Sequence, residues 1–299
     1  MQLRMRTIEQ GDGTPPPDAS LEPTAWHPAV SAVVLSFAMA QASAAPAQAD
    51  PGGGVSVHQL DVREAAFGDA RIGEREVGLA LWSPEFGFDR FAFGAAAHYA
   101  YVRYEYDGLP SRARDLHQLH LPLQWRGHED RWRVVLTPVI AASSNVFKDL
   151  FKRGSRDDFD VYGRWQYERW TDERRGWRVA LVRDAAFGAP RLYPAAALLW
   201  RGERVSAELG LPESRVQWLA LDHLGIGGAV FPTGGRWHVI SDERGGAEFD
   251  YVARAWRGAV TADWSPWRRL RVSVHAGVEF ARHYEFEADT GAPVDRDPR

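Results

Sequence analysis

Alternation of apolar and polar side chains organises the stretch from Asp158 to Val182, DFDVYGRWQYERWTDERRGWRVALV. From Phe159, the odd positions are apolar or small and end in Trp165 and Tyr167, whereas most even positions are charged or polar. Successive side chains of an extended strand point to opposite faces, so this pattern predicts a strand with one apolar-aromatic face and one charged face. A short charged connection leads to a second alternating run from Trp177, and the whole stretch predicts an antiparallel hairpin.

The same period of two recurs along the chain after Gly54, and no sustained period of 3.6 residues accompanies it. Pro122 interrupts one of the alternating runs, where it removes a ladder hydrogen-bond donor. About fifteen strands in roughly 250 residues leave about 16 residues for each strand and its connection, as in a meander of membrane-spanning strands. Besides the hairpin, strands are predicted over 55–62, 77–82, 91–106, 119–125, 132–142, 193–200, 205–211, 215–221, 224–231, 236–241, 248–253, 257–264 and 270–286.

The connections between these strands help to choose between a membrane protein and a soluble one. Short charged turns follow Trp125, Trp170, Trp200 and Trp264, and longer polar loops fall between them. Outer-membrane barrels place short turns in the periplasm and long loops outside, with aromatic belts at both interfaces. A soluble sandwich does not require tryptophans beside its short turns, although its strands could alternate in the same way. The pattern therefore favours a transmembrane barrel over a soluble periplasmic β-protein.

The predicted fold is all-β: an antiparallel up-and-down transmembrane β-barrel of about 14–16 strands. Counted from a periplasmic N-terminus, with 248–253 as a strand of its own, the run from Leu270 ascends and only a polar tail, GAPVDRDPR, follows. Bacterial single-chain barrels have an even number of strands and end in a closing strand. The count therefore predicts a wall that lacks its closing C-terminal strand, unless one strand has been miscounted.

The longest apolar segment, Ala29 to Ala40, is too short for a membrane-spanning helix. Small A-x-A sites follow it at 42–44 and 47–49, as in a secretory signal. Acidic residues outnumber Arg4 and Arg6 before it, which makes the n-region atypical and indicates a translation start downstream of Met1. We therefore predict a signal peptide over 1–49, removed on export, and a β-barrel domain over 50–299; a buried helix is the alternative.

Composition adds the aromatic content and excludes several classes of protein. The chain has 13 Trp, 9 Tyr and 14 Phe, which suits interfacial girdles, sugar binding or a very large core. Its 36 basic residues are offset by 40 acidic ones, so no nucleic-acid-binding patch is indicated. The absence of cysteine excludes disulfides and thiolate metal sites, and fits an exported bacterial protein.

The run from Leu270 contains the only constellation with catalytic potential. Arg271, Ser273, His275, Gly277 and Glu279 share one face, opposite a valine-rich face. Ser273 and His275 are the candidates for a nucleophile and a base on a barrel wall. However, Glu279 lies about 13 Å from His275 at ~3.3 Å per residue, too far to orient the imidazole directly. An inward polar row is also what any barrel wall presents, so Arg271 and Glu279 are predicted to line the lumen.

The first hairpin supplies a second inward row and an outward one. Asp160, Arg164 and Glu168 are predicted to line the lumen, either as ion pairs that fill it or as the lining of a solute path. Mixed charges neutralise one another, which favours filling. The opposite row, predicted to face lipid, consists of Phe159, Val161, Trp165 and Tyr167.

No established motif for a cofactor or a metal is present. His117 and His120 are three residues apart, which places them on opposite faces of a strand, so they are interpreted as turn or lumen histidines and not as a ligand pair. The Gly225–Gly228 segment lacks the spacing of a dinucleotide loop, and neither G-x-S-x-G nor a P-loop occurs. We therefore predict no metal and no cofactor.

Two long segments carry a resemblance to a known family. They are residues 193–240 and 251–286, with LGLPES at 209–214, GGRW at 234–237 and the spacing of Gly277, Arg282 and Phe286. The chain resembles a family of uncharacterised outer-membrane β-barrel proteins of Gram-negative bacteria, defined as a domain of unknown function. The resemblance is specific over about the last hundred residues. It implies an outer-membrane barrel and brings no known activity or catalytic residues, and the missing closing strand departs from the expected pattern.

The sequence thus predicts a monomeric barrel in the outer membrane of a Gram-negative bacterium, with a structural role or porin-like passive solute passage. Its expected partners are outer-membrane lipid and the barrel-assembly machinery during insertion, with no nucleic acid. One alternative is a barrel-embedded lipid-modifying hydrolase that uses Ser273 and His275. Another is a soluble periplasmic β-protein that binds sugars through its aromatic residues. Whether the lumen is open or plugged does not follow from the sequence.

Overall fold

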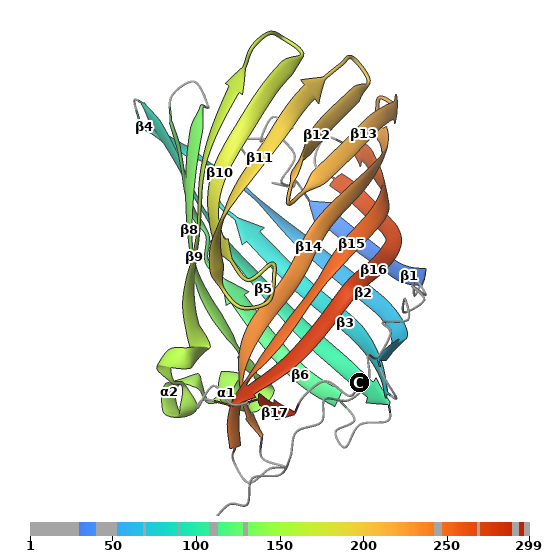
Figure 1. Ribbon diagram of the computed structural model, residues 1–299. Coiled ribbons are helices and arrows are strands. Elements are labelled where there is room, and N and C mark those ends of the chain that lie inside the picture. The colour runs from blue at the N-terminus through green and yellow to red at the C-terminus, as the bar shows by residue number, and fades with distance from the viewer. Residues whose placement is uncertain are drawn as a thin grey trace, which may run out of the picture.

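The computed structural model describes residues 30–39, 53–67, 70–88, 90–107, 113–127, 131–241, 247–267, 270–288 and 293–295. It is an all-β structure, with 81% strand and 5% helix, and its strands form a closed barrel (Figure 1). The predicted fold class is confirmed at this level. No helix in the described part of the chain is long and apolar enough to cross a membrane.

Long strands alternate with short connections from one end of the chain to the other. The first half contains β1 (Val30–Met39), β2 (Gly54–Phe67), β3 (Ala70–Trp82), β4 (Phe86–Phe88), β5 (Phe91–Asp107), β6 (Ala113–His120), β7 (Leu123–Gly127) and β8 (Trp132–Ser143). Two short helices, α1 (Ser144–Lys148) and α2 (Leu150–Arg153), and a 3-10 turn (Arg156–Asp158) follow β8. The second half contains β9 (Phe159–Trp170), β10 (Arg175–Asp184), β11 (Arg191–Arg201), β12 (Val205–Leu211), β13 (Ser214–Leu221), β14 (Leu224–Ser241), β15 (Ala247–Trp267), β16 (Leu270–Ala288) and β17 (Pro293–Asp295).

Antiparallel pairing between successive strands closes the sheet on itself. The ladder runs from β2 to β16, and β1 pairs with both β16 and β2. In addition, β14 meets β8 in parallel at His238 and Ala142, so that β8 to β14 form a closed seven-strand barrel. The edge of β16 that was expected to lack a neighbour is therefore paired with β1. Strand β1 is formed by the residues predicted as the apolar part of a secretory signal, and removal of 1–49 stays a prediction.

Two strands are longer than the sequence pattern predicted. A turn was expected at Pro232–Gly235, but β14 continues through it, and the two runs expected over 248–253 and 257–264 form the single strand β15. Glycine is required at position 234 by close packing and not by a turn, because a Cβ there would lie 2.6 Å from the Ala253 carbonyl oxygen. Pro232 is tolerated because the ladder with β13 ends at Val230. The single strand predicted over 119–125 is wrong, since Leu121 and Pro122 separate β6 from β7 and Pro122 cannot donate to the ladder.

The outer wall carries an apolar band toward the end with the short turns, the upper end in Figure 1. On β3, the outward positions Val77, Leu79 and Leu81 are all exposed, and the outward rows of the neighbouring strands continue the band. We define the apolar band by its exposed side chains: Val57, Val77, Leu79, Leu81, Phe91, Leu136, Phe159, Val161, Trp165, Val179, Leu181, Leu198, Leu209, Val216, Trp218, Ile226, Val230, Val260, Trp264 and Val274.

Figure 1 places α1 and α2 at the opposite end of the barrel, and toward that end the same outward rows become charged. Arg75 lies 3.7 Å from Asp61, and Arg103 lies 3.3 Å from Glu105. Farther round the wall, Arg254 lies 3.9 Å from Glu285. We call this part of the barrel the charged extension and define it by the outward side chains of Asp61, Arg75, Arg103, Glu105, Asp115, Arg254 and Glu285.

The interior shows the opposite pattern. Inside the apolar band, inward side chains are polar and paired, as in Arg178 with Glu168. Inside the charged extension, inward side chains form an apolar cluster, which we call the aromatic core: Ile72, Val102, Tyr104, Tyr106, Leu116, Val139, Ala141, Trp237, Val239, Phe249, Tyr251, Ala253 and Tyr284. Along one strand, therefore, the apolar face changes from the outside of the barrel to the inside.

The first hairpin illustrates the outer wall. Phe159, Val161 and Trp165 are 54%, 49% and 48% exposed on its outward face. Tyr167 lies on the same face and is partly covered by the ring of Trp177, 5.6 Å away between centroids. That this row contacts lipid stays a prediction.

Replacing Val161 by arginine should impair insertion, because a charge on the lipid side of a barrel costs up to about 2–4 kcal/mol at the bilayer midplane. The matched variant Gln166→Arg places the same charge on the inward face and should change insertion little. The measurement is the fraction of protein that shows heat-modifiable gel mobility after refolding into lipid vesicles. Equal losses for both variants would contradict an outer band that faces lipid.

Candidate functional site in the barrel interior

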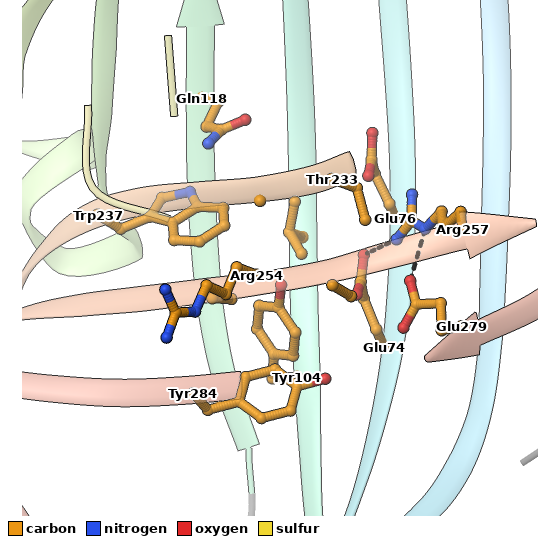
Figure 2. Close-up of a pocket in the computed structure, with 14 residues that line it drawn as sticks. Glu74, Glu76, Tyr104, Gln118, Thr233, Trp237, Arg254, Arg257, Glu279 and Tyr284 are labelled. Atoms are coloured by element: carbon orange, nitrogen blue, oxygen red, sulfur yellow. Dashed lines mark hydrogen bonds and ion pairs between the residues drawn. The ribbon is translucent and has the colours of Figure 1, made fainter. Parts of the chain in front are cut away.

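A buried ionic cluster lies where the aromatic core meets the polar part of the interior. Arg257 on β15 places Nη2 2.9 Å from Oε1 of Glu74 on β3, and Nε 2.5 Å from Oε1 of Glu279 on β16 (Figure 2). The Glu279 side chain is almost fully buried, and those of Glu74 and Arg257 nearly so. A guanidinium can serve two carboxylates in this way because its donors form a fixed planar fork. The cluster therefore joins strands from opposite parts of the sequence across the lumen.

A bulge in β16 adds a second cation to the cluster. Arg282 lies with Nε 2.9 Å from Oε2 of Glu279, three residues earlier. Residues three apart face opposite sides of a regular strand. Here the register between β15 and β16 shifts after Arg254, and Ala281 adopts φ 52°, so one extra residue restores Arg282 to the inward face. Alternation alone placed Glu279 inside the barrel but could not have found Arg282.

Farther toward the short turns, the interior is filled by a second set of ion pairs. Arg178 on β10 is 7% exposed and donates through Nε and Nη2 to Oε2 of Glu168, at 3.0 and 2.9 Å. Its Nη1 donates to Glu208 on β12. Of the predicted lumen row, Glu168 is thus paired, and Asp160 lies 2.7 Å from Nη1 of Arg183. Arg164 instead lines a cavity.

The cavities that the described residues line include two that lie near these ion pairs. The larger has a volume of about 400 Å³ and is lined by Arg164, Tyr162, His120 and Gln118, among others. The smaller has a volume of about 230 Å³ and lies against Arg257, where Nε2 of His58 donates a 2.8 Å hydrogen bond to Oε1 of Glu76. These spaces could hold small polar solutes or water. Neither contains a nucleophile placed against a base.

The two residues predicted as a catalytic pair point to different partners. Ser273 is 1% exposed and donates its hydroxyl hydrogen bond to Asp263, directly across the β15–β16 ladder. His275 lines the smaller cavity. Among the residues that the structure describes, no hydrogen bond joins Ser273 to His275. Arg271, the next inward residue, is half-buried at the end of the same row.

A different serine and histidine do meet, on the outer wall. His117 Nε2 lies 2.7 Å from Ser144 Oγ, and His117 Nδ1 lies 2.7 Å from the Tyr99 hydroxyl. The interpretation of His117 as a turn or lumen histidine is wrong, because its neighbours Leu116 and Gln118 face inward and His117 therefore faces outward. The approach of Ser144 depends on α1 and has no local signature in the sequence.

A buried histidine also holds the end of the barrel near α1. His238 on β14 lies with Nδ1 2.8 Å from Oδ1 of Asp158, and both side chains are almost completely buried. The hydrogen bond to Asp158 raises the pKa of His238, against the opposing effect of burial. Asp158 also accepts a 2.6 Å hydrogen bond from the Ser155 backbone. This pair therefore fixes the segment before β9 to the strand that closes the seven-strand barrel.

Comparison with known proteins found no family model and no curated protein that matches the chain. Within the described ranges, no group of three or more histidine and carboxylate side chains is placed to hold a metal ion. The resemblance to uncharacterised outer-membrane barrels thus stays a prediction.

Removal of the central cation of the ionic cluster should destabilise the protein strongly. In Arg257→Ala, Glu74 loses its partner while still buried and Glu279 keeps only Arg282, and breaking a buried pair in this way costs about 3–5 kcal/mol. The control Arg75→Ala removes an exposed pair with Asp61 and should cost at most about 1 kcal/mol. Urea unfolding in detergent measures both, and similar midpoints for the two variants would rule out a structural role for the cluster.

Alkaline pH should loosen the segment between β8 and β9. Because the folded-state pKa of His238 is raised above its usual value of 6.5, its contribution to stability is complete below pH 6.5 and is lost as the pH rises through the raised pKa. Hydrogen exchange or protease cleavage over 144–158 should therefore increase above neutral pH. The variant His238→Gln should lose this dependence, and His223→Gln, in the turn between β13 and β14, should keep it.

Proposed function

We propose that this protein is an outer-membrane β-barrel of a Gram-negative bacterium whose lumen is closed, and that its role is structural and not that of an open pore. The apolar band carries the proposal. On β15, the nine residues from Trp256 to Trp264 match the ~9–11 residues of a membrane-spanning strand. Exposed tryptophans near the short turns and the Trp256–Phe280 pair at the other edge fit the two aromatic girdles of such barrels.

The contrast between the two halves supports membrane insertion over solubility. The charged extension has a buried aromatic core and a charged surface, as a soluble barrel does. The apolar band has the reverse arrangement and would leave a continuous apolar surface in water, which soluble monomers avoid. The aromatic residues that a sugar-binding protein would use lie mainly on this outer band or within the core, and Tyr162 lines the larger cavity. A soluble periplasmic binder therefore has less support.

The filling of the lumen argues against free solute passage. The aromatic core and the Arg257 cluster occupy the interior of the charged extension, and their side chains are buried. A solute that enters from the short-turn end reaches the 400 Å³ cavity and then meets this packed layer. Passive passage would require the layer to move. The expected partners are therefore membrane lipid and, during insertion, the barrel-assembly machinery, with the protein acting as a monomer.

Extraction tests the membrane proposal directly. Protein from outer-membrane fractions should require detergent for release and should migrate faster in gels before heating than after it. Full release by alkaline carbonate without detergent would contradict the proposal.

Conductance tests the closed lumen. The wild-type protein in planar bilayers should give no stepwise conductance, whereas Trp237→Ala combined with Tyr251→Ala should produce channels because it removes two rings from the aromatic core. The control Tyr167→Ala removes a ring from the outer wall and should stay silent. Heat-modifiable mobility of each variant shows whether it has folded. Regular conductance steps from the wild-type protein would favour porin-like passage instead.

A further inference from the structure

The serine and histidine on the outer wall form a close three-member chain. His117 on β6 lies between the Ser144 hydroxyl, 2.7 Å from Nε2, and the Tyr99 hydroxyl, 2.7 Å from Nδ1. The imidazole is held from one side by the ring of Phe147, stacked at 4.8 Å with an interplanar angle of 15°. Tyr101 packs near the imidazole with 5.3 Å between centroids. Both ring nitrogens are thus oriented by hydroxyls while the ring plane is fixed.

Strand pairing explains how these residues meet. Leu116 belongs to the aromatic core, so the next residue, His117, points to the outside of the barrel. Its neighbour in the β5 ladder is Tyr101, and in the β8 ladder it is Ala142. Strand β8 ends at Ser143 and turns directly into α1, which brings Ser144 over the outer face of β6.

The geometry is that of an activated nucleophile. A serine hydroxyl becomes nucleophilic when a neighbouring imidazole accepts its proton and a third group orients the imidazole. The productive tautomer has Nδ1–H donating to the Tyr99 oxygen and Nε2 accepting from Ser144. Tyr99 is then a positioning residue, acting through His117. The interior pair Ser273 and His275 lacks this arrangement, because Ser273 donates to Asp263.

The position of the group on the wall indicates its substrate. Tyr101, the ladder neighbour of His117, pairs on its other side with Val77, at the edge of the apolar band. Beyond this level the outward rows are charged, beginning with Asp115, which accepts a 2.6 Å hydrogen bond from Tyr101. In a bilayer, acyl chains lie against the band and headgroups lie beyond it, so acyl ester linkages lie at this border. Lys148, four residues after Ser144, is exposed and suits an anionic headgroup.

We propose that Ser144, with His117 as its base, hydrolyses an acyl ester of membrane lipids that carry an anionic headgroup. Ser144 Oγ forms a bond to the ester carbonyl carbon, its proton passes to His117 Nε2, and the carbon–oxygen bond to the lipid alcohol breaks as His117 returns the proton to that alcohol. Water, deprotonated by His117, then forms a bond to the acyl carbon. The bond from that carbon to Ser144 Oγ breaks, His117 returns the proton to Oγ, and the fatty acid leaves. The choice of lipid as substrate rests on the proposed membrane location, whereas the Ser144–His117 pair does not.

A fluorophosphonate probe tests the nucleophile without a membrane. Full-length protein in detergent should be labelled at Ser144, as located by mass spectrometry of its peptides. Labelling should disappear in Ser144→Ala and fall at least tenfold in His117→Ala. The matched control Ser206→Ala, at an exposed serine on β12, should label as the wild type does. Absence of labelling in the wild type, or labelling that persists in Ser144→Ala, would overturn the proposal.

Release of fatty acid tests the substrate. Vesicles of phosphatidylethanolamine and phosphatidylglycerol should release fatty acid with the wild-type protein and not with Ser144→Ala, and vesicles of phosphatidylcholine alone should give a lower rate. Tyr99→Phe should lower the rate and move the acid limb of its pH profile to lower pH, because the imidazolium loses a hydrogen-bond acceptor. Hydrolysis that is lost in Ser273→Ala and kept in Ser144→Ala would overturn the assignment. Labelled Ser144 in a protein that carbonate extracts would overturn the membrane location alone.

Discussion

Each side chain of a strand points to one face of the sheet. In this chain, the apolar side chains of a strand point outward in one half of the barrel and inward in the other half. On β3, Val77, Leu79 and Leu81 point outward, whereas Ile72, nearer the opposite end, points into the aromatic core. One continuous hydrogen-bonded sheet therefore has two parts, whose inner and outer faces have opposite polarity. Its short-turn half resembles a membrane barrel and its other half a soluble one. The length of β14 to β16, which run through both halves, follows from this division.

At the junction of the two halves, inward polar side chains are buried from water and need partners within the protein. Arg257 pairs with both Glu74 and Glu279, and the bulge at Ala281 brings Arg282 to the carboxylate of Glu279. A buried charge network of this kind contributes little net stability compared with apolar packing. It joins β3, β15 and β16 across the lumen through specific charge pairs.

Local alternation was sufficient to predict the long strand β5 and the first hairpin, since each depends on neighbours in sequence, but it joined β6 and β7 across Pro122. It wrongly predicted a turn at Gly234, because a glycine in the sequence indicates a turn and close packing equally well. It missed Arg282 because a bulge changes the parity of a strand without changing its composition. The pairing of His117 with Ser144 depends on where α1 folds back, which only the three-dimensional arrangement determines.

The charged extension has a consequence for biogenesis. If the protein inserts into a membrane as proposed, with the short turns on the side from which it arrives, the side chains of Arg103, Glu105 and Arg254 must pass through the hydrocarbon layer, together with α1 and α2. Translocating so many charges unaided is energetically prohibitive. Under the proposed membrane location, the far half would therefore cross through a passage that shields its charges from the hydrocarbon. Lipid alone should admit this barrel far more slowly than one without such a half.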